Sequence, residues 1–261
     1  MRFRGSLLVL TLAVFTAACA SSRPTTLPPG TEQADQFLFE QGQASMESRR
    51  WSNAREYFRQ IVDNYPQSPY RPDAKLGIGD AYIGERTTES LILAVSEFRE
   101  FLTFYPTNAR ADYAQYRLAI AFSHQMLAAE RDQTATRDTI REVEVFLERY
   151  PNSRLMPEVR TLLRDAQDRL SEASYRVGLY YFRAKWYPGA IDRFRAVLTN
   201  DPQYTRRDAV YYHLAESLLR TSRAAEALPY YERLVTEFER SEHLESSRRR
   251  ITELKAAQGA S

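Results

Sequence analysis

The side chains that most often carry catalysis or bind metals are scarce in this sequence of 261 residues. It contains one cysteine, Cys19, and three histidines, His124, His213 and His243. A helical zinc pair places two ligands four positions apart, and none of these residues has a histidine or cysteine at that spacing. A lone cysteine also excludes an internal disulfide. The sequence therefore predicts neither a metal site nor a disulfide framework.

Nucleophilic and phosphate-binding motifs are missing as well. Gly77 and Gly79 stand inside an amphipathic stretch, where a glycine serves close packing and not a phosphate loop. No G-x-S-x-G sequence occurs that would expose a serine on a sharp turn. Carboxylate pairs such as Glu142 and Glu144 are predicted on solvated helix faces. An enzyme is therefore not predicted.

The charge balance gives no sign of a nucleic-acid partner. The chain has 36 basic and 34 acidic residues, for a formal net charge of +2. Two of the basic residues, Arg2 and Arg4, precede an apolar run near the start, so the remainder is balanced. Nucleic-acid binding usually needs a strongly basic face, because contacts to the phosphate backbone dominate the affinity.

The first 18 residues have the pattern of an export signal. Two arginines are followed by an apolar run over 7–18, which is shorter than the roughly 20 residues that span a bilayer. The run ends in Thr16-Ala17-Ala18-Cys19, which resembles the bacterial lipobox, although Thr16 stands where leucine is usual. The resemblance implies that Cys19 becomes the first mature residue and carries N-acyl and S-diacylglycerol lipid. An ordinary cleaved signal with an incidental cysteine is the alternative.

The residues after the cysteine indicate where such an anchor would reside. Ala20 stands in place of the aspartate that retains these lipoproteins at the inner membrane. The resemblance therefore implies a lipid anchor in the cell outer membrane, with the protein on the periplasmic face. Residues 19–32 are rich in Pro, Ser and Thr and lack an apolar period, which predicts an extended tether.

The rest of the chain repeats one pattern. Amphipathic stretches end at Pro66, Pro106, Pro151 and Pro202. Within them a small or aliphatic residue usually precedes a large apolar one by four positions, as at Ala54 and Phe58, and a small-to-large pair such as Gly79 and Tyr82 lies upstream. This is the tetratricopeptide pattern, in which small residues let helices approach and aromatics fill the gaps. The sequence predicts an all-α solenoid of five helix–turn–helix units over 33–245, followed by a charged tail or cap over 246–261.

The spacing between units is regular except at one place. Thirteen positions separate Pro66 from Gly79, but 27 separate Pro151 from Gly178. The excess predicts a long helix of roughly 28 residues that opens unit four. The segment 124–138, HQMLAAERDQTATRD, is also longer than its counterparts and is predicted to project from the solenoid as a loop.

The first helix of each tetratricopeptide unit is expected to line a peptide-binding groove. The positions that would face this groove are mostly aromatic or aliphatic and include Phe39, Leu76 and Tyr116, with Glu216 in unit five. Such a surface favours apolar or aromatic peptide segments over charged tails. The alternative is that neighbouring repeats or the chain termini fill much of it.

Several motifs together resemble the BamD family of lipoproteins, also called YfiO or ComL. They are Tyr65-Pro66-Gln67-Ser68-Pro69-Tyr70 with the following Ala74, Leu76, Ala81 and Tyr82, then Tyr150-Pro151-Asn152-Ser153, the pair Tyr180-Tyr181, and Trp186. With the lipobox and the long helix, the resemblance covers essentially the whole chain.

This resemblance implies a part in folding and inserting outer-membrane β-barrel proteins. The implied partners are the POTRA region of a BamA-type barrel subunit, other Bam lipoproteins and nascent outer-membrane proteins, but no nucleic acid and no cofactor beyond the covalent lipid. The implied substrate-peptide groove contains Phe39, Tyr70, Leu76, Tyr82 and Tyr116. The implied BamA-like contact contains Trp186 and Arg193.

Two other functions stay open at this stage. A tetratricopeptide pilotin lipoprotein for a secretin or type IV pilus would share the leader and the repeats, but not the YPxSPY junction. A cell-wall remodelling enzyme would need a catalytic carboxylate pair or a Ser or Cys site, which the sequence does not offer.

Overall fold

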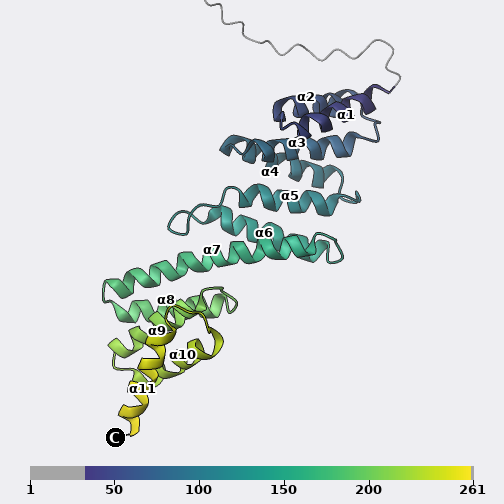
Figure 1. Ribbon diagram of the computed structural model, residues 1–261. Coiled ribbons are helices and arrows are strands. Elements are labelled where there is room, and N and C mark those ends of the chain that lie inside the picture. The colour runs from purple at the N-terminus through teal and green to yellow at the C-terminus, as the bar shows by residue number, and fades with distance from the viewer. Residues whose placement is uncertain (1–32, 260–261) are drawn as a thin grey trace, which may run out of the picture. The chain divides into compact units, whose positions relative to one another are not determined.

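The computed structural model describes residues 33–259, which form α-helices connected by short turns and loops (Figure 1). The prediction of an all-α fold is confirmed for this part of the chain. The helices are α1 (Ala34–Glu47), α2 (Trp51–Asn64), α3 (Arg71–Glu85), α4 (Thr88–Phe104), α5 (Ala111–Ser123), α6 (Thr134–Arg149), α7 (Met156–Arg183), α8 (Tyr187–Asn200), α9 (Arg207–Arg220), α10 (Ala224–Glu237) and α11 (Leu244–Gly259). The predicted signal, Cys19 and the tether lie outside the described residues.

The helices pack in the order in which they occur in the chain. From α2 onward, each helix contacts the next one, and α3, α5, α7 and α9 also contact each other in succession. The odd-numbered helices are thus neighbours across units, as in a tetratricopeptide array. None of the described helices is long and apolar enough to cross a membrane.

Aromatic rings on the even-numbered helices pack against glycines on the odd-numbered helices. A Cβ atom placed on Gly79 would lie 2.6 Å from the ring of Phe98, and one on Gly178 would lie 2.6 Å from the ring of Phe194. Both phenylalanines are 0% exposed. The helices can approach this closely only because these positions lack a side chain, so the predicted small-to-large pattern corresponds to real contacts.

Serine hydroxyls in the turns that follow a helix pair tie the end of that pair back to its start. After α2 the chain turns at Pro66, and the Ser68 hydroxyl donates a 2.6 Å hydrogen bond to Asp35 at the start of α1. Two later turns repeat this contact, with Ser153 bonded to Asp112 at 2.5 Å and Ser241 to Asp208 at 2.6 Å. In the fourth pair the roles are exchanged, since Ser171 on α7 donates to Asp201 at 2.6 Å.

The predicted long helix is confirmed, because α7 contains 28 residues. The prediction that residues 124–138 project as a loop is wrong. Residues from Thr134 onward belong to α6, and the loop before it folds back on α7, where Arg169 donates a 2.7 Å hydrogen bond to the Leu127 carbonyl. Gln133 is 6% exposed and donates to the carbonyls of Ala128 and Arg131, so it closes the loop on itself.

Helix α11 packs against α10 and begins at Leu244, slightly before the boundary predicted for the cap. Ile251 and Leu254 pack against the core formed by α7 to α10. Arg250 donates two hydrogen bonds to Glu216 on α9, at 2.8 and 3.2 Å, and Tyr231 on α10 donates a third at 2.6 Å. Glu216 is therefore covered by the protein's own last helix and does not face an open groove.

Two of the histidines come together although 30 positions separate them. The rings of His213 and His243 lie 5.4 Å apart, and His243 stacks on Tyr212 at 4.3 Å. Burial lowers the pKa of both histidines, so neutral rings are favoured inside this aromatic cluster. Within residues 33–259, no group of three or more His, Cys, Asp or Glu side chains is placed to hold a metal ion.

Candidate partner-binding surfaces

The first candidate surface is a small cavity between α1 and α3, which we call the N-terminal cavity. Its volume is about 170 Å³, and its lining residues are Phe39, Gln43, Met46, Phe58, Asp73, Leu76, Gly77, Asp80 and Arg110. Phe39 is partly exposed and stacks on Tyr70, with ring centroids 5.1 Å apart. Three of the residues predicted for the substrate groove, Phe39, Tyr70 and Leu76, therefore lie together.

The other two predicted groove residues lie elsewhere. The Tyr82 side chain is 6% exposed, its hydroxyl accepts a 2.6 Å hydrogen bond from Arg59, and the Arg55 guanidinium lies 4.4 Å from its ring centroid. This packing on α2 removes Tyr82 from the N-terminal cavity. Tyr116 packs against the core between α5, α6 and α7. Leu76 does line the cavity, but it is only 1% exposed, so it offers little area to a ligand.

Charged residues also line the N-terminal cavity. Arg110 forms an ion pair with Asp73 at 2.8 Å, and Arg117 forms one with Asp80 at 2.6 Å. The Tyr113 hydroxyl donates a 2.8 Å hydrogen bond to Asp80, and burial together with this carboxylate raises the pKa of Tyr113. The Arg117–Asp80 pair joins α3 to α5, and Asp73, Asp80 and Arg110 line the cavity themselves, so it presents charged as well as apolar side chains.

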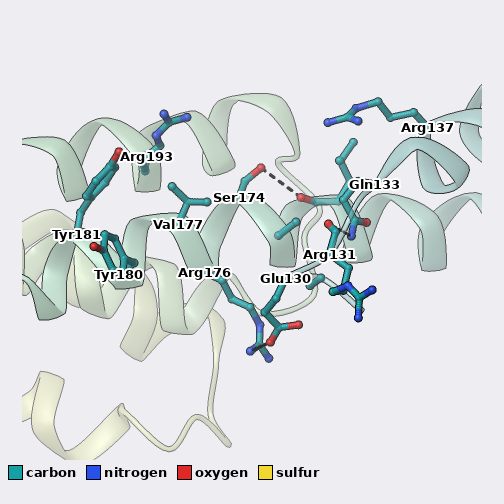
Figure 2. A pocket seen from close by; sticks show the side chains of 13 residues that line it. Glu130, Arg131, Gln133, Arg137, Ser174, Arg176, Val177, Tyr180, Tyr181 and Arg193 are labelled. Carbon is teal, nitrogen blue, oxygen red and sulfur yellow. Dashed lines mark hydrogen bonds and ion pairs between the residues drawn. The ribbon is translucent and has the colours of Figure 1, made fainter. Parts of the chain in front are cut away.

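The second candidate surface is a larger cavity along α7, which we call the α7 cavity. Its volume is about 510 Å³. It is lined by Ala129, Glu130, Arg131, Gln133, Arg137, Leu170, Ala173, Ser174, Arg176, Val177, Tyr180, Tyr181 and Arg193 (Figure 2). These residues come from the loop before α6, from the first turns of α6, from α7 and from α8.

Arg193, predicted as a partner contact, lines the α7 cavity with its side chain exposed. Trp186 does not line it. The indole is 56% exposed and meets the ring of Tyr181, which does line the cavity, in an edge-on contact at 4.7 Å. A Cβ atom on Gly189 would lie 2.6 Å from the indole, so this glycine allows the ring to lie against α8. Trp186 and Arg193 therefore belong to one continuous surface through Tyr181.

Glu130 and Glu172, two carboxylates near the α7 cavity, are already paired with an arginine. Arg176 forms ion pairs with Glu130 and, at 2.7 Å, with Glu172. Burial alone would raise the pKa of Glu172, but hydrogen bonds from Tyr204 and Arg176 reverse this effect and lower it. The sequence does not predict Arg131 and Arg137 at this site, because they precede Arg193 by more than 50 positions. The prediction that Glu142 lies on a solvated face is wrong, since it is 8% exposed and accepts a 3.0 Å hydrogen bond from Gln115.

The similarity of the chain to known proteins agrees with this architecture. A tetratricopeptide-repeat family model matches residues 209–241. The chain is 27% identical over 222 residues to the outer membrane protein assembly factor BamD of Caulobacter vibrioides, which covers 83% of this chain and 72% of that protein. It is 24% identical over 230 residues to BamD of Xylella fastidiosa strain Temecula1, with 82% and 78% covered.

Among solved structures, the TPR2AB-domain:pHSP90 complex of yeast Sti1 is 12% identical, with a TM-score of 0.49 over 85% of this chain and 83% of that one. A family model described as outer membrane lipoprotein, YfiO, matches residues 31–221. This match runs from the start of the described residues through α9 and therefore includes both candidate surfaces. The chain belongs to the YfiO family of outer membrane lipoproteins.

Proposed function

We propose that this protein is a non-catalytic scaffold of a Bam-type complex that assembles β-barrel proteins in the outer membrane. The observation that carries the proposal is the match of the YfiO family model over residues 31–221, together with relatives named as outer membrane protein assembly factors. A repeat of packed helices with surfaces on different units suits a scaffold, because each unit can hold a different partner.

A lipid on Cys19 would hold the scaffold at the periplasmic face of the outer membrane, with 19–32 as its tether. Stable anchoring takes more than one acyl chain, which the lipobox resemblance supplies. Confinement at a membrane raises the effective concentration of anchored partners, so the individual contacts can stay modest.

The surface around Trp186 and Arg193 is the proposed contact to a BamA-type barrel subunit. It offers exposed aromatic rings and the Arg193 guanidinium, which forms no ion pair with the residues that the structure describes. Aromatic and arginine side chains are the residue types that dominate protein interfaces. Tyr180, which is 67% exposed, enlarges the aromatic area next to Trp186. Burying these rings against a partner would remove apolar surface from water, and Arg193 could pair with a carboxylate of that partner.

Affinity purification from membranes tests this contact. The tagged protein is expected to stay in the membrane fraction at high salt, to enter detergent, and to bring down a BamA-type subunit. Arg193→Glu should reduce the recovered subunit by about tenfold, because a like charge would face the partner carboxylate. Arg160→Glu makes the same charge change on an exposed position of α7 outside the cavity and should leave recovery unchanged. Recovery of a secretin without a barrel subunit would favour the pilotin alternative.

The N-terminal cavity is the proposed site for aromatic segments of nascent barrel proteins. The stacked pair of Phe39 and Tyr70 supports this, since an aromatic side chain of a ligand could extend the stack. Phe39→Ala with Tyr70→Ala is expected to lower crosslinking to a peptide with a C-terminal phenylalanine by several-fold. The control is Phe104→Ala, which removes a ring that is 67% exposed and lines neither cavity. Equal crosslinking in all three proteins would contradict the assignment.

A further inference from the structure

The α7 cavity exists because α7 is longer than its neighbours. The first half of the helix packs against α5 and α6, where Val159 meets Val143 and Phe146. The second half packs against α8 and α9, where Tyr175 meets Phe194. Between these two cores, one side of α7 lines the cavity, together with Arg137 of α6 and Arg193 of α8.

One face of the middle of α7 forms the floor of the cavity. Leu170, Ala173, Ser174 and Val177 line it, and their spacing of three, four and seven positions places them on one side of the helix. Val177 is 41% exposed. The floor is therefore largely apolar, and it remains open to solvent.

The walls of the cavity are basic. Among the residues that the structure describes, Arg131, Arg137 and Arg193 have no carboxylate within ion-pair distance. Arg176 is the exception, since Glu130 and Glu172 neutralise it. Glu130, the acidic residue that lines the cavity, is paired with Arg176, and Asp132 lies near Arg137 without an ion pair. A carboxylate of a ligand placed beside Arg131, Arg137 or Arg193 would therefore gain Coulomb energy.

We propose that the α7 cavity binds an acidic segment of a partner protein, in which carboxylates flank an apolar or aromatic side chain. This inference rests on the proposed function, because it names the chemistry of the partner at a surface that includes Arg193. The apolar side chain would lie on the floor at Val177, and the carboxylates would pair with Arg193 at one end and with Arg131 and Arg137 at the other.

The positions of the arginines favour such a segment over a single phosphate group. A phosphate is best held by donors that converge on one point. In Figure 2, Arg193 lies on one side of the stretch from Ser174 to Val177, and Arg137 lies on the other. Charges separated in this way match two carboxylates on an extended chain, with a side chain between them.

A peptide titration with the full lipoprotein in detergent tests the inference. The probe is a fluorescent decapeptide, blocked at both ends, that contains two Glu-Phe-Glu triplets, and a matching peptide carries glutamine in place of glutamate. We expect the glutamate peptide to bind more tightly than the glutamine peptide and to weaken as salt is added. Arg131→Ala with Arg137→Ala should weaken it by about five- to tenfold, as for two partly exposed ion pairs.

The matched control is Arg154→Ala with Arg160→Ala, which removes two exposed arginines from outside the cavity and should leave binding unchanged. Circular dichroism checks that all variants keep their helix content. Equal binding of both peptides, equal loss in the control, or displacement of the peptide by millimolar inorganic phosphate or by anionic lipid vesicles would overturn the inference.

The capture experiment separates this inference from the proposed function. If Arg131→Ala with Arg137→Ala leaves peptide binding intact while Arg193→Glu still loses the barrel subunit, the acidic-segment inference fails and the proposed function stands. If the glutamate peptide binds as expected but the tagged protein recovers no barrel subunit from membranes, the proposed function fails. The inference that the α7 cavity binds an acidic segment then still stands.

Discussion

Replacing Phe194 with alanine is expected to lower the free energy of unfolding by about 3–5 kcal/mol, the usual cost of truncating a buried phenylalanine. The ring is 0% exposed and packs directly against Gly178 of α7, and the ring centroids of Tyr175 and His213 lie 5.7 Å and 6.0 Å from its own. Truncation would leave a cavity that a glycine cannot fill. Urea denaturation followed by circular dichroism measures the change.

Phe104→Ala is the matched control, because this phenylalanine ends α4 and is 67% exposed. Its loss should change the free energy of unfolding by no more than about 0.5 kcal/mol. The glycine opposite Phe194 supplies a second comparison. Gly178→Ala gains about 1 kcal/mol of helix propensity, but its Cβ would meet the Phe194 ring. We therefore expect Gly178→Ala to lower the free energy of unfolding of the native protein. In a protein that already carries Phe194→Leu, the same substitution should not lower it. Similar losses for Phe194→Ala and Phe104→Ala would contradict the close packing of α7 on α8.

The features that the sequence predicted well are those that depend on neighbouring residues. Gly178 and Phe194 belong to adjacent helices of one pair, and the period of the pattern decides that they meet. Pro151 ends a helix because it lacks an N–H group, and the distance to Gly178 then sets the length of α7. These features follow from residues within one helix pair or one helix, whichever other unit those residues contact.

The features that the sequence could not predict depend on contacts between units. The amphipathic pattern of α6 leaves Glu142 on its polar side, but Gln115 and the neighbouring α5 cover it. The loop before α6 is long and polar, which is typical of a projecting loop. The hydrogen bond from Arg169 to Leu127 and the ion pair between Arg176 and Glu130 show that it folds back on α7. The α7 cavity depends on this folding, since the loop brings Arg131 to the same space as Arg193.

The same dependence on contacts between helices explains why only some of the predicted substrate-groove residues lie together. The repeat pattern predicts Phe39 and Leu76 in the groove, the family resemblance adds Tyr70, and these three lie together. The resemblance also implies Tyr82, but the preceding helix supplies Arg55 and Arg59 to its ring and hydroxyl. Two arginines on a facing helix can cover a tyrosine that the repeat pattern alone would leave open.

A second large loss of stability is expected at the contact between α9 and α11. Glu216→Ala should lower the free energy of unfolding by about 2–3 kcal/mol. The carboxylate is 6% exposed and accepts hydrogen bonds from Arg250 and Tyr231, so its removal leaves two donors without an acceptor. Breaking a fully buried ion pair typically costs 3–5 kcal/mol, but the Arg250 side chain is 36% exposed and water can partly replace the lost partner.

Glu245→Ala is the matched control for this ion pair. Glu245 pairs with Arg248 at 2.8 Å on the surface of the same helix, with both side chains more than half exposed. Its removal should cost no more than about 0.5 kcal/mol, because solvent screens an exposed pair and ordering the two side chains opposes the attraction. Equal losses for Glu216→Ala and Glu245→Ala would show that α11 is not held by the Glu216 pair.

The loss at Glu216 should also depend on pH in one direction. Burial alone would raise the pKa of Glu216, but hydrogen bonds from Arg250 and Tyr231 lower it below the ordinary value of 4.5. A carboxyl whose pKa is lower in the folded protein stabilises the fold fully above pH 4.5, and this stabilisation is lost as the pH falls through the folded pKa. The difference in free energy of unfolding between the native protein and Glu216→Ala should therefore be largest near pH 7 and shrink towards pH 3. A difference that stays constant or grows on acidification would mean that packing alone, and not the charged hydrogen bonds, holds α11 in place.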